Sequence, residues 1–184
     1  ANQTVLEIAQ AHGVKKVIKG KSMVTEETGL REFLQAQGIE VVETDLGEYI
    51  IQLAGETPFH IIAPALHKTK QEVSALFHEW LKSAPTEDVQ ELCGIARQAL
   101  REHFATADMG VTGANFLVAE TGDVVLVTNE GNGRMTTSMP RVHVVVTGIE
   151  KLVPALEDLA VFLRLLPRAA TGQAITSYVT TVNG

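Results

Sequence analysis

The sequence predicts an α/β fold of three layers, with helices on both faces of a mixed, mostly parallel sheet. Segments rich in β-branched residues alternate with helical segments of about 10 to 15 residues, a pattern typical of parallel strands joined by right-handed crossovers. Hydrophobic residues make up 45% of the 184 residues and charged residues 20%. Because this composition and length suit one sizeable core, we expect residues 1–184 to form a single domain.

Two helix-to-strand steps open the chain. Apolar side chains recur at helical spacing over residues 5–9, and a β-rich segment follows at 14–19. A second apolar helix face, over residues 30–34, leads into a strand at 39–42. A glycine follows each helix, and glycine favours the left-handed backbone with which many helices end.

Capping patterns predict where the next two helices begin. A Glu three residues after a capping side chain is typical of a capping box, and this spacing occurs twice, at Asp45 with Glu48 and at Thr69 with Glu72. The first begins a short helix that carries residues 49–53, and the second begins a helix with an apolar stripe over 73–81. We expect that stripe, Trp80 included, to be core. Residues 59–63 predict the third strand.

The middle of the chain predicts a long helix and then a hairpin. Apolar side chains at helical spacing predict a helix over residues 89–104 that is entered at Thr86, and we interpret Cys93 as a small buried residue on it. Two β-rich runs, 115–119 and 123–128, are joined by a Glu-Thr-Gly segment typical of a hairpin. A purely parallel sheet is therefore not expected.

The C-terminal part predicts a strand, a helix and a last strand. These lie at 141–147, 153–166 and 174–182, and a proline is tolerated in the first turn of that helix. The Gly-Asn-Gly segment at 131–133 gives backbone freedom for close approach to a ligand or forms a plain turn. We reject a dinucleotide-binding fingerprint because Thr136 stands at the third glycine position and because the segment is predicted to lie between strands.

Composition excludes several classes of function. A net charge of −7, without a dense run of Lys or Arg, opposes nucleic-acid binding. The sequence lacks an apolar run of the roughly 20 residues that span a membrane, and the first residues lack the features of a signal peptide, so we expect a cytoplasmic protein. One cysteine cannot build a disulfide framework. Since no ligand pattern for zinc or calcium occurs, we predict no metal.

Polar side chains are concentrated after the predicted strands, where open α/β sheets bind ligands. Their cations can neutralise a carboxylate or phosphate if they converge, and the alternative is that they cap helices and form surface ion pairs. His67 follows a predicted strand, and imidazole titrates near neutrality, so His67 is the candidate for proton transfer. The candidate ligand-binding residues are Lys19, Lys21, Ser22, Glu43, Asp45, Lys68, Asn115, Asn129, Asn132, Arg134, Glu150 and Lys151.

Seven motifs occur in the order found in the LUD domain family, and they extend over most of the chain. They are KGKSMVTEE at 19–27, ETDLGEYIIQ at 43–52, PALHK at 64–68, GVTGANF at 110–116, AETG at 119–122, NEGNGR at 129–134 and GIEK at 148–151. The chain therefore resembles the LUD domain of the iron-sulphur subunit of bacterial lactate-utilisation systems.

This resemblance implies a fold like the NagB/RpiA/CoA-transferase group and a role in oxidising L-lactate to pyruvate with partner subunits, LutA-like and LutC-like. It also implies that the chain is partial, without an N-terminal stretch and without the C-terminal iron-sulphur domain. The 4Fe-4S clusters are expected in the full-length protein, and no cofactor is expected in this fragment. CoA transferases of similar fold use a Glu nucleophile, which makes Glu130 a second candidate catalytic residue.

Three functions follow as hypotheses. The first is a domain of an oxidoreductase complex that binds a small organic anion, or docks partner subunits, and is inactive alone. The second is an independent enzyme of the CoA-transferase or sugar-phosphate-isomerase kind that uses Glu130 and His67. The third is a non-catalytic interaction module.

Overall fold

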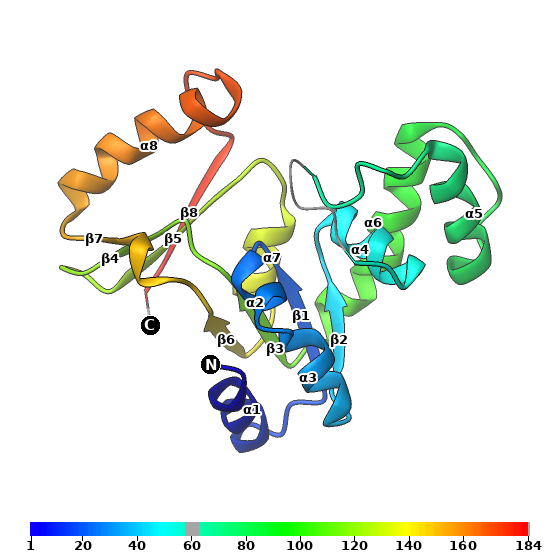
Figure 1. Ribbon diagram of the computed structural model, residues 1–184, viewed down its shortest axis with the longest axis horizontal. Coiled ribbons are helices and arrows are strands. Elements are labelled where there is room, and N and C mark those ends of the chain that lie inside the picture. Colours follow the sequence, from blue (N-terminus) through cyan, green and yellow to red (C-terminus); the bar gives the residue numbers. More distant parts are fainter. Residues whose placement is uncertain (58–62, 184) are drawn as a thin grey trace.

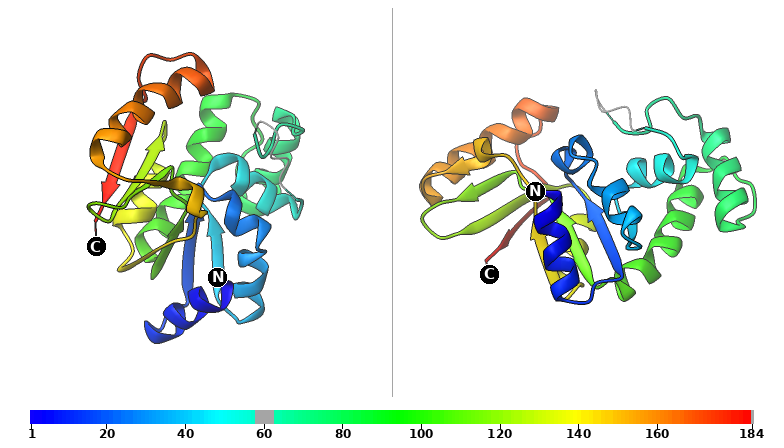
Figure 2. Two further views of the ribbon diagram at one scale, coloured as in Figure 1. Left: turned by 60° about the vertical axis from the view of Figure 1, so that its left-hand side comes forward. Right: turned by 60° about the horizontal axis from the view of Figure 1, so that its bottom comes forward.

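A parallel sheet of four strands forms the centre of the computed structural model, which describes residues 1–57 and 63–183 (Figure 1). The strand order is β2-β1-β3-β6. These strands are β1 (Lys16–Gly20), β2 (Glu40–Glu43), β3 (Met109–Thr112) and β6 (Val142–Val145). The predicted α/β class is confirmed, but the parallel and antiparallel strands expected in one mixed sheet are divided between this sheet and a second one, which Figure 2 shows beside it. Except for Ala63, the strand predicted at 59–63 lies outside the described residues.

Helices cover both faces of this sheet. Successive strand side chains point to opposite faces, so Val17 packs with the residues of α1 and α3 while Ile18 packs with those of α4 and α6. These helices are α1 (Asn2–Ala11), α3 (Leu30–Ala36), α4 (Leu46–Ala54) and α6 (Val89–Thr106), and α5 (Lys70–Leu81) packs against α4 and α6. The three layers are as predicted. Of the helices described, none is both long and apolar enough to cross a membrane.

A second sheet of four strands contains the antiparallel pairs, in the order β7-β4-β5-β8. Its strands are β4 (Phe116–Val118), β5 (Asp123–Thr128), β7 (Leu152–Val153) and β8 (Tyr178–Val182). The predicted hairpin is confirmed, since β4 pairs antiparallel with β5. The last helix, α8 (Leu156–Thr171), packs Leu159 against this sheet and leaves Phe162 44% exposed. Figure 1 shows the second sheet and α8 to the left of the parallel sheet.

Two elements beside the site differ from the sequence predictions. The segment at 131–133 is not a turn between strands, because it opens the helix α7 (Asn132–Ser138), which follows β5 and precedes β6. The central strand β3 was not predicted either. It is only four residues long and begins with Met-Gly, so only its last two residues are β-branched.

Several smaller predictions also need correction. Trp80 is 58% exposed rather than core, and Cys93 is exposed rather than buried. The long helix begins with Asp88 as its N-cap, two residues after Thr86, because the Asp88 carboxylate accepts from two backbone amides of the first turn. α8 begins three residues after the predicted start at residue 153 and ends five residues after the predicted end at residue 166. The capping box at Thr69 is confirmed.

Gly110 allows α7 to lie directly against β3. A Cβ atom added at Gly110 would meet the backbone oxygen of Thr136 at 2.0 Å, which is far inside van der Waals contact. Any larger side chain at Gly110 must therefore push α7 away from the sheet.

We expect Gly110→Ala to lower the free energy of unfolding by about 1–3 kcal/mol, the usual cost of overpacking a core. Gly94→Ala is the matched control, since Gly94 is an exposed helical residue with open space around its Cα. That change should raise stability by up to about 1 kcal/mol through helix propensity. Urea denaturation measures both, and equal stability of the two variants would contradict the close packing.

Candidate functional site

The neighbouring strands β1 and β2 end side by side and bury an ion pair close to their ends. Lys19 and Glu43 are opposite each other in the parallel register. Lys19 Nζ lies 3.0 Å from both carboxylate oxygens of Glu43, and the two residues are only 1% and 2% exposed. The structure thus brings together two candidates from the sequence, and each neutralises the charge of the other.

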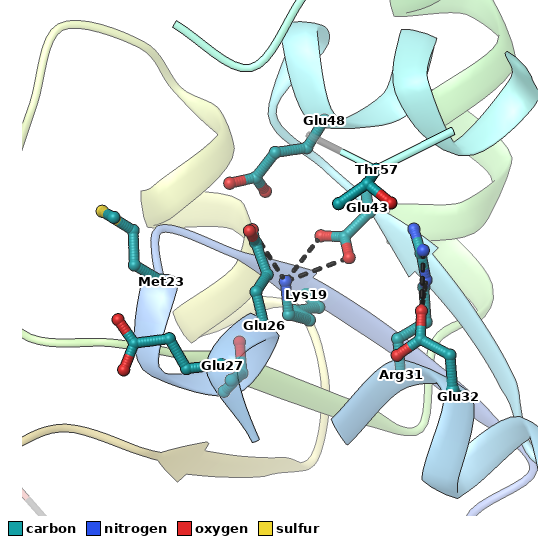
Figure 3. A pocket seen from close by; sticks show the side chains of 10 residues that line it. Lys19, Met23, Glu26, Glu27, Arg31, Glu32, Glu43, Glu48 and Thr57 are labelled. Atoms are coloured by element: carbon teal, nitrogen blue, oxygen red, sulfur yellow. Dashed lines mark hydrogen bonds and ion pairs between the residues drawn. The ribbon is translucent and has the colours of Figure 1, made fainter. Parts of the chain in front are cut away.

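A cavity of about 420 Å³, here called the acidic cavity, opens beside this pair. Figure 3 shows the carboxyl groups of Glu26, Glu43 and Glu48 turned toward the space around the Lys19 ammonium group. Glu26 belongs to α2 (Met23–Glu27), and its Oε1 atom lies 3.7 Å from Lys19 Nζ. The lining residues are Lys19, Met23, Thr25, Glu26, Glu27, Arg31, Glu32, Glu43, Glu48 and Thr57.

Glu48 carries its proton at neutral pH. Burial raises the pKa of its carboxyl group to about 9; Lys19 opposes this, while the carboxylates of Glu43, Asp45 and Glu26 add to it. Glu48 is 7% exposed, and within the described residues its Oε2 atom has no hydrogen-bond partner. Asp45 caps α4 as predicted, but Glu48 faces the acidic cavity rather than completing a capping box.

A second group of charged side chains lies just beyond the ends of β1 and β2. Lys21 has a left-handed backbone with φ of 60°, and its Nζ lies 3.5 Å from Asp45 Oδ2. Glu130 follows β5 and is close enough to both for their charges to act on it. Partial burial of its carboxyl group raises its pKa, Asp45 raises it further, and Lys21 lowers it. Lys21, Asp45 and Glu130 therefore converge.

Lys21 and Glu130 line a small pocket of about 280 Å³, here called the polar pocket. It lies between the end of β5 and the C-terminal turns of α8, and half of its lining side chains are uncharged donors or acceptors. Asn115 accepts a hydrogen bond from the backbone of Val127 at 2.7 Å through its side-chain oxygen. The lining residues are Lys21, Asn115, Val127, Thr128, Asn129, Glu130, Leu166, Pro167, Ala170, Thr171, Gln173 and Thr176.

Buried polar side chains join the strand ends to α7. The Asn132 amide donates to the backbone oxygen of Thr44 at 3.2 Å, and the hydroxyls of Thr44 and Thr136 are hydrogen-bonded at 3.2 Å. All three residues are less than 10% exposed. Asn132 therefore braces the site, and it also lines a groove beside α7. This groove, of about 720 Å³, is lined by residues of both α6 and α7 and reaches Glu130.

Apart from Asn129, the other candidate residues make local contacts away from these two groups. Ser22 caps α2 by accepting from the Thr25 amide, and the Arg134 guanidinium lies 5.4 Å from the centre of the Tyr178 ring. The remaining four form two surface groups: His67 and Lys68 share Glu56, and Glu150 lies 4.0 Å from Lys151. Asn129 lines the polar pocket.

Sequence reasoning missed Glu26 and Glu48. Neither residue follows a strand, since both lie on helices that begin just after β1 and β2. The glutamates in the first turns of these two helices were the available signal. Over residues 1–57 and 63–183, no group of three or more His, Cys, Asp or Glu side chains is arranged to hold a metal ion.

Comparison with known proteins identifies relatives over the whole chain. The sequence matches the LUD domain family over residues 1–184. It is 49% identical over 184 residues to "Lactate utilization protein B" of Oceanobacillus iheyensis and 51% identical over 185 residues to the protein of that name from Macrococcus caseolyticus. The Bacillus subtilis protein of that name is 47% identical over 185 residues. The chain spans 38–39% of the length of these relatives. No solved structure matches it.

Removing one partner of the buried ion pair should destabilise the fold strongly. Lys19→Met leaves the Glu43 carboxylate buried beside other carboxyl groups, and we expect a loss of about 3–5 kcal/mol in the free energy of unfolding. The double variant Lys19→Met/Glu43→Leu should recover most of this loss, because no charge is then left unpaired between the strands. Urea denaturation at pH 7 compares the two, and a double variant that is less stable than the single one would refute this explanation.

The Glu48 proton predicts how stability depends on pH. Because the folded-state pKa is about 9 against an ordinary value of 4.5, the folded state binds one more proton than the unfolded state between these values. The stabilisation that the folded state gains from this proton is therefore complete below the unfolded-state pKa, and it is lost as the pH rises toward 9.

The stability of Glu48→Gln should accordingly rise relative to the parent protein between pH 5 and pH 9, by at most about 1.4 kcal/mol per pH unit. Urea denaturation at pH 5, 7 and 9 measures this difference. A constant difference over that range would show that Glu48 is already ionised in the folded protein.

Proposed function

Since this chain belongs to the LUD domain family over its whole length, we propose that it is the α/β domain of an iron-sulphur protein of lactate utilisation. The observation that carries this proposal is the 47–51% identity, over the whole chain, to proteins named lactate utilization protein B. Because the chain spans 38–39% of those proteins, the activity belongs to the longer protein and its partners rather than to this domain alone.

The proposed reaction of the complete system is the oxidation of L-lactate to pyruvate. Each lactate gives up two electrons and two protons, and the electrons pass to 4Fe-4S clusters held outside this domain. LutA-like and LutC-like subunits are the proposed partners, and the proposed location is the cytoplasm. In this scheme the present domain is not the redox centre; it binds a small organic anion.

The polar pocket is the proposed place for that anion. The Lys21 side chain is 31% exposed and its contact with Asp45 is long, at 3.5 Å, so its ammonium group can also bind a ligand carboxylate. Asn129 and Glu130 lie beside it. A protonated Glu130 can donate to an anionic ligand, and burial with the nearby Asp45 raises its pKa toward that form. The acidic cavity is the less suitable site, because its carboxylates repel an anion.

The independent-enzyme alternative receives less support. It assigns Glu130 and His67 to one machinery, but His67 contacts Glu56 while Glu130 interacts with Lys21 and Asp45. The two residues thus belong to different charged groups.

Lactate titration of the reconstituted system tests the proposal. The full-length protein with Lys21→Met should need roughly tenfold or more lactate for half-maximal turnover, because a charge-assisted hydrogen bond is lost. Lys15→Met is the matched control, since Lys15 is exposed and precedes β1 at the opposite end of that strand; its titration should match the parent. An unchanged titration for Lys21→Met would remove the polar pocket from lactate binding. Absence of any lactate-dependent turnover in the parent complex would refute the function itself.

A further inference from the structure

The acidic cavity contains three carboxyl groups close to one ammonium group. Lys19 is held by both oxygens of Glu43, with Glu26 at 3.7 Å. The other cation in the lining, Arg31, is bonded to Glu32 at 2.7 Å. Among the described lining residues, both basic side chains are therefore already paired, and the five acidic side chains outnumber them.

Glu48 is the third carboxyl group of this arrangement. It is 93% buried, being 7% exposed, and its Oε2 atom has no hydrogen-bond partner in the described part of the chain. Figure 3 shows its carboxyl group pointing from α4 into the cavity, toward the carboxyl group of Glu26 on α2. A buried polar atom without a partner is costly, and one that faces a cavity marks a place where a ligand can supply the missing bond.

We propose that the acidic cavity binds an organic ammonium cation, whose N–H groups donate to Glu48 and Glu26. The sign of the charge follows from the carboxyl groups around it, which repel a carboxylate or phosphate. A volume of about 420 Å³ has room for an alkyl chain as well as the charged group, and Met23 offers an apolar contact in the lining. The described carboxyl groups are not arranged as a metal site.

Binding displaces a proton. The ammonium group enters with its positive charge, Glu48 loses its carboxyl proton to solvent, and the new carboxylate accepts a hydrogen bond from the ligand. Within the described residues, the charged groups that act on Glu48 are Lys19 on β1, Glu43 on β2, Glu26 on α2 and Asp45 at the start of α4. Three of these disfavour the Glu48 carboxylate, so the arriving cation supplies the charge that its ionisation requires. Affinity should therefore rise with pH up to about 9, where the free carboxyl group loses its proton unaided.

Isothermal titration calorimetry of the full-length protein tests this site, with n-butylammonium and 1,4-diaminobutane as probes. At pH 7.5, a comparison of buffers with different ionisation enthalpies should reveal release of up to one proton for each ligand bound. Glu48→Gln should release none and bind roughly tenfold or more weakly, because a charge-assisted bond is lost. Glu7→Gln, an exposed change on α1 outside the cavity, should bind as the parent does.

Two further measurements separate this proposal from general affinity for alkyl chains and from misfolding. n-Butanol has the same chain without the charge and should not bind detectably. Glu26→Gln changes the other proposed acceptor and should also weaken binding, so that the test does not rest on one variant. The proposal is overturned if neither amine gives saturable binding, if n-butanol binds as tightly as n-butylammonium, or if both Gln variants in the cavity keep the parental affinity. None of these outcomes depends on whether the polar pocket binds lactate.

Discussion

The buried pair of Lys19 and Glu43 is the interaction on which the strand-end site depends. Removing two charges from water costs several kcal/mol per ion, and this cost is offset only when the geometry is good. Here the parallel register of β1 and β2 places the two residues opposite each other, and both Glu43 oxygens bond to the ammonium group. Any other register of these strands would leave one charge buried and unpaired. The pair therefore ties the site to the pairing of the sheet.

The same pair explains the protonation of Glu48. A single ammonium group, already bonded to Glu43 and close to Glu26, cannot also compensate a third buried carboxylate. The fold therefore holds Glu48 neutral, at the cost of a carboxyl oxygen that has no hydrogen-bond partner among the described residues. Two residues after Lys19, just beyond the end of β1, the left-handed backbone at Lys21 turns a second ammonium group toward Asp45 and Glu130. Two cavities of different electrostatic character thus lie beside the same pair of strands.

The features that local sequence patterns predicted are those that short-range interactions determine. The alternation of helix and strand, the caps at Asp45 and Thr69 and the hairpin at 116–128 all depend on residues close together in the chain. β3 and α7 depend instead on each other, since the missing side chain of Gly110 provides the space for α7. Such a contact between distant segments leaves no periodic pattern in either of them. These two elements were therefore missed.

The same distinction between local and long-range interactions applies to the residues of the site. The rule that ligands bind beyond the strand ends found Lys19, Glu43, Lys21 and Asp45, because parallel neighbours end at the same edge. It could not separate them from His67, which also follows a predicted strand but pairs with Glu56. Glu48 was interpreted as a capping residue because its spacing from Asp45 fits that role equally well. The two roles differ in whether the Glu48 side chain is buried in the cavity, and only the folded structure decides this.

The central claim is that the fold keeps one carboxyl group protonated beside a buried ion pair. Carbon-13 NMR of the protein labelled at glutamate side-chain carboxyls, with Glu48→Gln to assign the signal, measures this directly. Our account predicts that the Glu48 resonance keeps the chemical shift of the neutral acid through pH 7 and titrates with a pKa of about 9. A resonance that titrates near the ordinary value of 4.5 would show that Glu48 is ionised in the native protein, and the account would be wrong.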